Sequence, residues 1–114
     1  VMLKRESEEF MVEDIDVPED GLWYLDWVYA NGNGDITTDR KCAIRTLYID
    51  GERVDICVFP QRGVDNWQEW GVTSPVAVRL GKGRHTVSLR FEPENDNMHI
   101  DTNEFMIREL HLAK

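Results

Sequence analysis

The sequence is poor in basic residues and has no long apolar run. Its 114 residues include 13 Lys and Arg against 22 Asp and Glu, which gives a formal net charge of −9. Binding to a nucleic-acid backbone rests on clustered Lys and Arg, so this balance argues against a nucleic-acid partner. No stretch approaches the roughly 18 to 20 apolar residues of a membrane span. We therefore expect a soluble chain with neither nucleic acid nor membrane as a partner.

Cysteine is also scarce. Cys42 and Cys57 are too few for a zinc site by themselves and lack the C-x-x-C spacing of redox and metal motifs. They flank a turn signal at Asp50-Gly51, and antiparallel pairing about that turn places Cys42 opposite a position beyond Cys57. Because a disulfide tolerates little misalignment, we expect free, largely buried thiols.

Catalytic motifs are absent from the sequence. It contains no Gly-x-Ser-x-Gly elbow, no His-Glu-x-x-His pair and no glycine loop that opens a helix to hold phosphate. Carboxylates are abundant, but abundance without a motif does not indicate a glycosidase pair. His85 and His111 stand singly in strand-like segments and are interpreted as structural. The domain itself is therefore predicted not to be an enzyme.

Short apolar runs between turn residues predict an all-β fold, because no segment keeps helical spacing for three turns. The predicted strands cover residues 10–17, 22–30, 43–49, 54–59, 76–80, 85–91 and 105–112. One chain of this length closes one core, so we predict a single domain over residues 1–114, built as an antiparallel two-sheet β-sandwich.

Two side-chain patterns make the strand prediction more specific. In the segment 22–30 every second residue is large and apolar, which predicts that one face is buried; the residues are Trp23, Leu25, Trp27 and Tyr29. The turn residues Pro18 to Gly21 predict a hairpin between this strand and the preceding one. Arg45 occupies an inward position in its strand and must be paired, so an ion pair with Asp26 or Glu13 is expected.

Three segments in a fixed order resemble the sugar-binding modules of families 6 and 35. They are Gly-Leu-Trp-Tyr-Leu-Asp-Trp-Val-Tyr-Ala-Asn at 21–31, Leu-Tyr-Ile-Asp-Gly at 47–51 leading to Val-Phe-Pro at 58–60, and Trp-Gln-Glu-Trp-Gly at 67–71 followed by the segment 78–89. The resemblance covers residues 9–112. It implies a galactose-binding-like jelly roll that recognises a carbohydrate, most simply a poly- or oligosaccharide, without catalysing a reaction.

A longer pattern is similar to the C-terminal accessory domains of large bacterial glycoside hydrolases of trehalase-like or debranching-like type. It joins Tyr-Ala-Asn-Gly-Asn-Gly at 29–34, Asp-Arg-Lys-Cys-Ala-Ile-Arg at 39–45 and Phe-Pro-Gln-Arg-Gly at 59–63. This resemblance implies a domain excised from a larger polysaccharide-degrading enzyme, a linked catalytic domain as partner, and a periplasmic or extracellular location. An alternative function is a structural accessory domain that packs against the catalytic domain and binds no sugar.

A sugar site needs an exposed aromatic ring for stacking and nearby polar groups for hydrogen bonds. Trp67 lies in a segment with few apolar neighbours and is the first candidate for stacking; the alternative is that it caps the core. Asn97 is the polar candidate that the resemblance implies. Three long polar segments lie between predicted strands, at residues 31–41, 60–69 and 92–103. Further candidates in these segments are Asn31, Asn33, Asp35, Arg62 and Asn95. The alternative for the asparagines is a set of turn residues with no ligand.

The resemblance also raises the question of a structural calcium ion. Modules of families 6 and 35 usually hold calcium with a Glu-x-Glu pair on an earlier strand and a late Asp. Here the oxygen ligands would have to come from Glu6, Glu8, Glu9 and Asp101, whose placement the sequence leaves open. A second possibility, Asn31, Asn33 and Asp35 at alternate positions, lacks the acid at loop position twelve. No cofactor and no metal ligand are therefore predicted, and calcium stays an open alternative.

Overall fold

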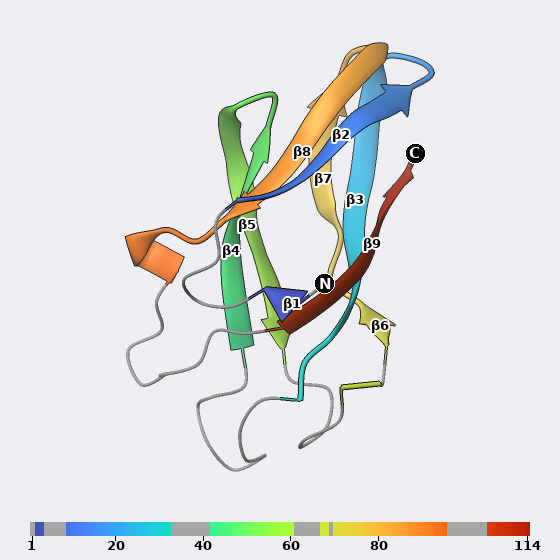
Figure 1. The fold of residues 1–114 in the computed structure, drawn as a ribbon. Helices are drawn as coiled ribbons and strands as arrows, with labels where there is room; N and C mark the ends of the chain where they lie inside the picture. Colours follow the sequence, from blue (N-terminus) through green and yellow to red (C-terminus); the bar gives the residue numbers. More distant parts are fainter. Residues whose placement is uncertain (1, 4–8, 33–41, 61–66, 69, 96–104) are drawn as a thin grey trace.

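The computed structural model describes residues 2–3, 9–32, 42–60, 67–68, 70–95 and 105–114. Most of these residues lie in nine strands, with one short 3-10 helix (Figure 1). The elements are β1 (Met2–Leu3), β2 (Phe10–Val17), β3 (Gly21–Ala30), β4 (Cys42–Ile49), β5 (Glu52–Pro60), β6 (Gly71–Val72), β7 (Val76–Leu80), β8 (Gly83–Arg90), η1 (Pro93–Asn95) and β9 (Phe105–Ala113). Within these ranges no helix has the length and apolarity needed to cross a membrane.

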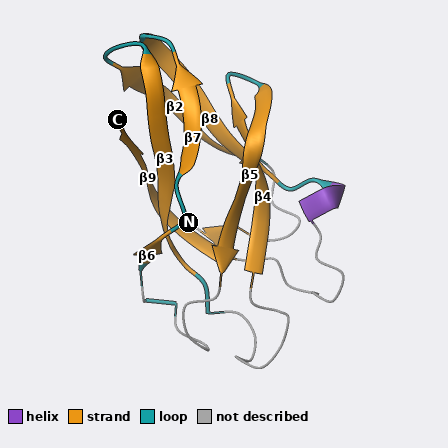
Figure 2. Ribbon diagram, turned by 180° about the vertical axis from the view of Figure 1, so that it is seen from behind, coloured by secondary structure: helices purple, strands orange, loops and turns teal. Residues whose placement is uncertain are grey.

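The strands form two antiparallel sheets packed face to face (Figure 2). The first sheet has the order β1-β9-β3-β6, and β7 also pairs with β3. The second has the order β2-β8-β4-β5. All pairings are antiparallel, so the predicted all-β, two-sheet sandwich is confirmed.

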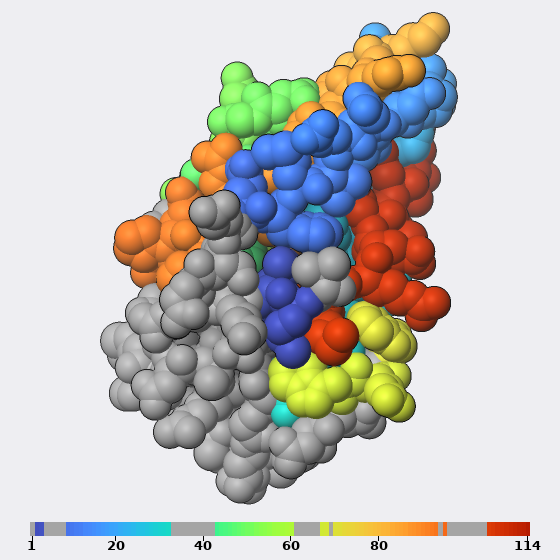
Figure 3. Space-filling view, viewed as in Figure 1, coloured from blue at the N-terminus to red at the C-terminus, as the bar shows by residue number. Residues whose placement is uncertain are grey.

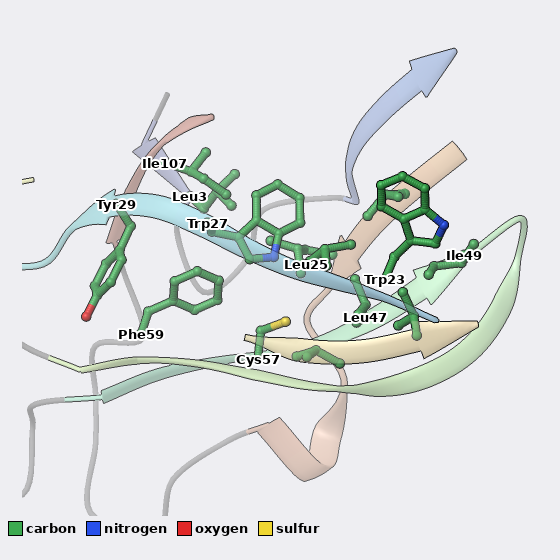
Figure 4. Packing of buried hydrophobic residues seen from close by; sticks show 14 of the residues in the cluster. Leu3, Trp23, Leu25, Trp27, Tyr29, Leu47, Ile49, Cys57, Phe59 and Ile107 are labelled. Carbon is green, nitrogen blue, oxygen red and sulfur yellow. The ribbon is translucent and has the colours of Figure 1, made fainter. Parts of the chain in front are cut away.

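The inward face of β3 runs through the core. The predicted row of Trp23, Leu25, Trp27 and Tyr29 is buried, as Figure 4 shows. Leu47, Cys57 and Phe59 of the opposite sheet face this row. Burial of large aromatic and aliphatic side chains, worth about 1.5–3 kcal/mol each, supplies the main stabilisation of the sandwich.

Thr73 completes the edge of β3 between β6 and β7. Its backbone N–H donates to the carbonyl of Trp27 at 3.0 Å, and its hydroxyl oxygen accepts from the N–H of Trp27 at 3.0 Å. One residue therefore satisfies both backbone groups of Trp27 at the gap between the two short partner strands.

The hairpin predicted at Pro18 to Gly21 is wrong. β2 pairs with β8 in one sheet, whereas β3 pairs with β9, β7 and β6 in the other. The chain crosses between the sheets at residues 18–20. Turn residues mark where a chain reverses direction, but they do not select the sheet that receives the next strand.

The hairpin predicted at Asp50-Gly51 is confirmed. Asp50 and Gly51 have φ values of 53° and 83°, which suits a two-residue turn with both central residues in the left-handed region. The register places Cys42 opposite Pro60, three positions beyond Cys57. Cys57 is free and buried as predicted, and burial raises the pKa of its thiol to about 12. The side chain of Cys42 lies outside the described part of the structure.

The end of the sandwich that holds this turn carries a group of polar contacts around one histidine, His85. We call this group the histidine cluster. His85 Nδ1 lies 2.6 Å from Asp50 Oδ2, and His85 Nε2 lies 2.7 Å from the carbonyl oxygen of Gly81. Asp50 Oδ1 also accepts the backbone N–H of Thr86 at 2.8 Å. Both ring nitrogens of His85 face acceptors, so only the doubly protonated imidazolium donates both bonds. The structural role predicted for His85 agrees with these contacts.

The cluster predicts a pH-dependent part of the stability. The Gly81 carbonyl and then the Asp50 carboxylate raise the pKa of His85 above its ordinary 6.5. A folded-state pKa above the unfolded one gives stability that is fully present below about pH 6.5 and is lost as pH rises through the folded value. Between pH 6 and pH 9, the wild type should lose about 0.2–1 kcal/mol more unfolding free energy than His85→Gln. Urea unfolding at both pH values measures this difference, and equal pH dependence in the two proteins would contradict it.

Candidate functional site

The strand ends opposite the histidine cluster form the candidate site. β3 ends there at Ala30, β4 begins at Cys42, β5 ends at Pro60 and β9 begins at Phe105, all at the lower end in Figure 1. We call this the loop-bearing end. The sequence segments that contain the predicted ligand-binding residues begin and end at these strand ends. The positions of the strand ends therefore fix where each segment starts and stops.

Three aromatic rings in contact form the base of the loop-bearing end. Phe59 and Phe105 stack with ring centroids 4.0 Å apart and an interplanar angle of 17°. Tyr29 meets Phe59 edge to face, with centroids 5.3 Å apart and an angle of 80° (Figure 4). All three side chains are buried, and they come from both sheets. The rings therefore hold the two sheets together directly beneath the site.

Two hydrogen bonds fix the end of β3 to the end of β5. The hydroxyl of Tyr29 donates to the carbonyl oxygen of Pro60 at 2.8 Å. The Asn31 side-chain amide nitrogen donates to the carbonyl oxygen of Phe59 at 2.8 Å. Both bonds cross between the sheets, so the segments that follow residues 32 and 60 leave from a fixed frame.

This places Asn31 differently from the exposed rim position expected for a ligand-binding residue. Its side chain is 1% exposed, and it continues the inward row of β3. Tyr29 and Asn31 lie two residues apart on the same face of an extended chain, so the alternation itself already indicated an inward Asn31. Its described contact is to the backbone of β5, so it holds the end of β3 to the end of β5.

Asn95 is also buried, with 1% of its surface exposed. Its side-chain oxygen accepts the hydroxyl of Thr46 at 3.1 Å and the backbone N–H of Glu92 at 2.8 Å. The hydroxyl of Tyr48 donates to Glu92 Oε2 at 2.6 Å. These bonds attach η1 to the outer side of β4, where Figure 2 shows the helix. The described contacts of Asn95 are therefore also structural.

Arg45 places a buried positive charge close to the base of the site. Its guanidinium lies 5.1 Å from the ring centroids of both Phe91 and Phe105, and Nη1 donates to the carbonyl of Ile44 at 2.9 Å. Burial lowers its pKa to about 10, so it remains charged at neutral pH. The predicted pairing with Asp26 or Glu13 is wrong. Both carboxylates lie outside the core: Asp26 pairs with His111 at 3.2 Å, and the Glu13 side chain is exposed on β2.

Trp67 is partly exposed, and its neighbour Gln68 is exposed. Trp70 is also partly exposed, and the guanidinium of Arg108 lies 5.6 Å from its ring centroid. In Figure 3 the described residues 67–68 and 70–72, coloured yellow-green, reach the surface at the loop-bearing end. The exposed surface of Trp67 is what a stacking residue requires, and its role in binding stays a prediction.

Four predicted site residues lie outside the described residues: Asn33, Asp35, Arg62 and Asn97. The same holds for the calcium candidates Glu6, Glu8 and Asp101. Glu9 is described, and its carboxylate contacts Arg90 and the hydroxyl of Ser88. Across the described ranges no three His, Cys, Asp or Glu side chains lie close enough to hold a metal ion.

Neither a family profile nor a curated protein matches the sequence. Among solved structures, the chain is similar to part of a Paenibacillus sp. cycloisomaltooligosaccharide glucanotransferase complexed with cycloisomaltoheptaose. The identity is 25% and the TM-score 0.68, over 90% of this chain but only 12% of that one. This chain thus spans about an eighth of that protein.

Two isolated modules have the same architecture. A family 35 carbohydrate-binding module from an environmental isolate is 13% identical, with a TM-score of 0.67 over 93% of this chain and 65% of that one. A Xyl-CBM35 in complex with a glucuronic acid containing disaccharide is 19% identical, with a TM-score of 0.66 over 93% of this chain and 66% of that one. The predicted fold of the family 6 and 35 modules is therefore confirmed.

The hydrogen bond of Tyr29 gives a test of the frame at the loop-bearing end. Tyr29→Phe removes the donor to Pro60 and leaves the buried ring in place, so unfolding free energy should fall by about 1 kcal/mol. Tyr24→Phe is the matched control, because Tyr24 lies on the outer face of the same strand and is exposed. Urea unfolding compares the two variants. Equal losses would show that the Tyr29 bond does not fix the strand ends.

Proposed function

We propose that this domain is a non-catalytic carbohydrate-binding module that holds an oligosaccharide or polysaccharide at the loop-bearing end. The observation that carries the proposal is Trp67, a partly exposed indole between β5 and β6 in a fold shared with family 35 modules. Sugars offer apolar C–H faces ringed by hydroxyl groups, and an indole beside polar side chains complements both.

Rigidity of the frame supports this proposal. Binding loses free energy whenever it has to order protein segments, and a site on a fixed base loses less. The Tyr29–Pro60 and Asn31–Phe59 bonds hold the departure points of two segments within one buried unit. Asn31 therefore keeps a role in the proposed site as a positioning residue, whereas Trp67 and the predicted residues Asn33, Asp35, Arg62 and Asn97 are the ones proposed to contact sugar.

The larger context is also a proposal. The similar glucanotransferase is much longer than this chain, and its structure contains a cyclic oligosaccharide. We infer that this domain is joined to a glycoside hydrolase and acts outside the cytoplasm, where polysaccharides are found. Tethering then makes a weak sugar site useful, because it raises the effective concentration of the linked enzyme at its substrate.

One observation favours a second function, a structural domain that docks another polypeptide and binds no sugar. Three apolar side chains on β5, those of Val54, Ile56 and Val58, are exposed in a row. An exposed edge strand with apolar side chains is a site at which another polypeptide can pair or pack. The two functions use different surfaces and are separable by substitution.

Affinity electrophoresis in neutral and acidic polysaccharides, with and without calcium, tests the sugar proposal. Trp67→Ala should weaken retention at least about tenfold, equivalent to ~1.4 kcal/mol, because the stacking surface is lost. Tyr24→Ala is the control, since it removes an exposed aromatic ring from the face of β3 away from the core. Both variants should keep the wild-type circular dichroism spectrum.

Retention that vanishes only in the Trp67 variant supports the module and places its site. Retention that survives in folded Trp67→Ala removes Trp67 from the site. No retention of the wild type in any polysaccharide, under either condition, overturns the proposed function in favour of the structural domain.

A further inference from the structure

The apolar row on β5 lies at the free edge of a sheet. β5 is last in the order β2-β8-β4-β5 and, within the described residues, pairs only with β4. Val54, Ile56 and Val58 are 41%, 43% and 40% exposed, whereas Cys57 and Phe59 between and beyond them are buried. The second half of the strand therefore buries Cys57 and Phe59 on one face, and the first half, from Glu52 to Ile56, is exposed throughout.

The backbone of β5 is also open toward this edge. The N–H of Ile56 donates to Asp55 Oδ1 at 2.8 Å, within the same strand. Backbone groups alternate in direction along a regular strand, so Val58 has the same orientation as Ile56. Val54 lies at a register shift in the pairing with β4 and is not part of this regular alternation. Ile56 and Val58 therefore combine an exposed apolar side chain with N–H and C=O groups that face away from β4.

Two depressions lie along the same side of the molecule. One, of about 380 Å³, lies between β5 and β7 and is lined by Ile56, Cys57, Val58 and by Ser74 to Ala77. The second, of about 280 Å³, lies nearer the histidine cluster and is lined by Val54, Val78 and Leu80 among others. An extended chain beside β5 would find space for its side chains in both.

The charge along this side of the molecule favours one kind of partner strand over another. The two depressions are lined by three carboxylates, those of Asp50, Glu52 and Asp55, and by Arg79 and His85. His85 pairs with Asp50, which leaves Glu52 and Asp55 as the acidic groups offered to a partner. The chain as a whole carries a formal charge of −9. A second copy would add the same negative charge and bring its own Asp55 to the contact, which disfavours self-pairing. A basic segment gains attraction at the same positions.

We propose that the free edge of β5 is a docking surface for an extended segment of another polypeptide, with apolar side chains at alternate positions and Lys or Arg between them. The segment adds as a strand beside β5. A partner carbonyl takes over the Ile56 N–H from Asp55, and a partner cation pairs with the released carboxylate. This docking surface is distinct from the loop-bearing end and does not require that the domain bind sugar.

The probe is a synthetic peptide, Lys-Val-Lys-Val-Lys-Val-Lys with blocked ends, titrated into the ¹⁵N-labelled domain and followed by amide chemical shifts. A peptide of the same composition with its three valines contiguous is the matched control. The alternating peptide should shift the amides of Val54, Ile56 and Val58 most and bind at least fivefold more tightly than the control peptide.

Two pairs of variants separate strand addition from general attraction. Val58→Pro removes an edge N–H that β4 does not use, so the fold should survive while peptide affinity falls at least fivefold. Ile56→Thr should weaken binding two- to fivefold, whereas Val72→Thr, the same kind of change at an exposed residue outside the row, should leave it unchanged. If Val58→Pro fails to fold, the comparison of Ile56→Thr with Val72→Thr still tests whether the peptide binds at β5.

Equal binding of both peptides, or binding that Ile56→Thr leaves unaltered, overturns the proposal and reduces the effect to attraction between opposite charges. Sedimentation equilibrium of the wild type tests the other occupant. A dimer that Val58→Pro dissociates overturns the basic partner in favour of a second copy. Sugar retention should stay at the wild-type level in Ile56→Thr, so the outcome here is independent of the Trp67 experiment.

Discussion

The inward row of β3 is the constraint on which the rest of the structure depends. It begins with Trp23 near the histidine cluster and ends with Asn31 at the loop-bearing end, so it contacts the core along the whole length of the sandwich. β3 also pairs with β9 on one side and with β6 and β7 on the other. Displacement of this strand would disturb both the first sheet and the base of the candidate site. Tyr29 and Asn31, at the end of the row, make the hydrogen bonds that join β3 to the end of β5.

Alternation of side chains made much of this predictable from sequence. The buried row of β3, the Asp50-Gly51 hairpin and the offset of Cys42 from Cys57 follow from period-two patterning and from the positive φ that this turn demands. The crossing at Pro18 was not predictable, because local residues do not encode which sheet a strand joins. The true neighbours of Arg45 depend on long-range packing for the same reason.

The candidate site was predicted less completely. The exposure of Trp67 agrees with its expected role, but Asn31 and Asn95 have buried side chains with protein partners. Asn31 is two residues beyond Tyr29, so the alternation along β3 predicts an inward side chain even though asparagine is polar. For Asn95 no sequence pattern indicates that Thr46, 49 residues earlier, reaches it. A polar residue between two strands can therefore hold the fold through protein contacts, as Asn31 and Asn95 do, and composition alone does not reveal that role.

Three connections at the end with the histidine cluster are very short: residues 18–20, 50–51 and 81–82. The Asp20 carboxylate accepts the backbone N–H of Lys82 and so joins the first connection to the third. His85 lies between Asp50 and the carbonyl of Gly81 and so joins the second to the third. Lys82 is exposed and belongs to the connection between β7 and β8. Figure 1 shows this connection at the end of the sandwich opposite the loop-bearing end, with β5 running along the side between the two ends. An immobilisation handle at Lys82 would orient every molecule on a sensor surface in one direction and leave both proposed surfaces accessible to flow.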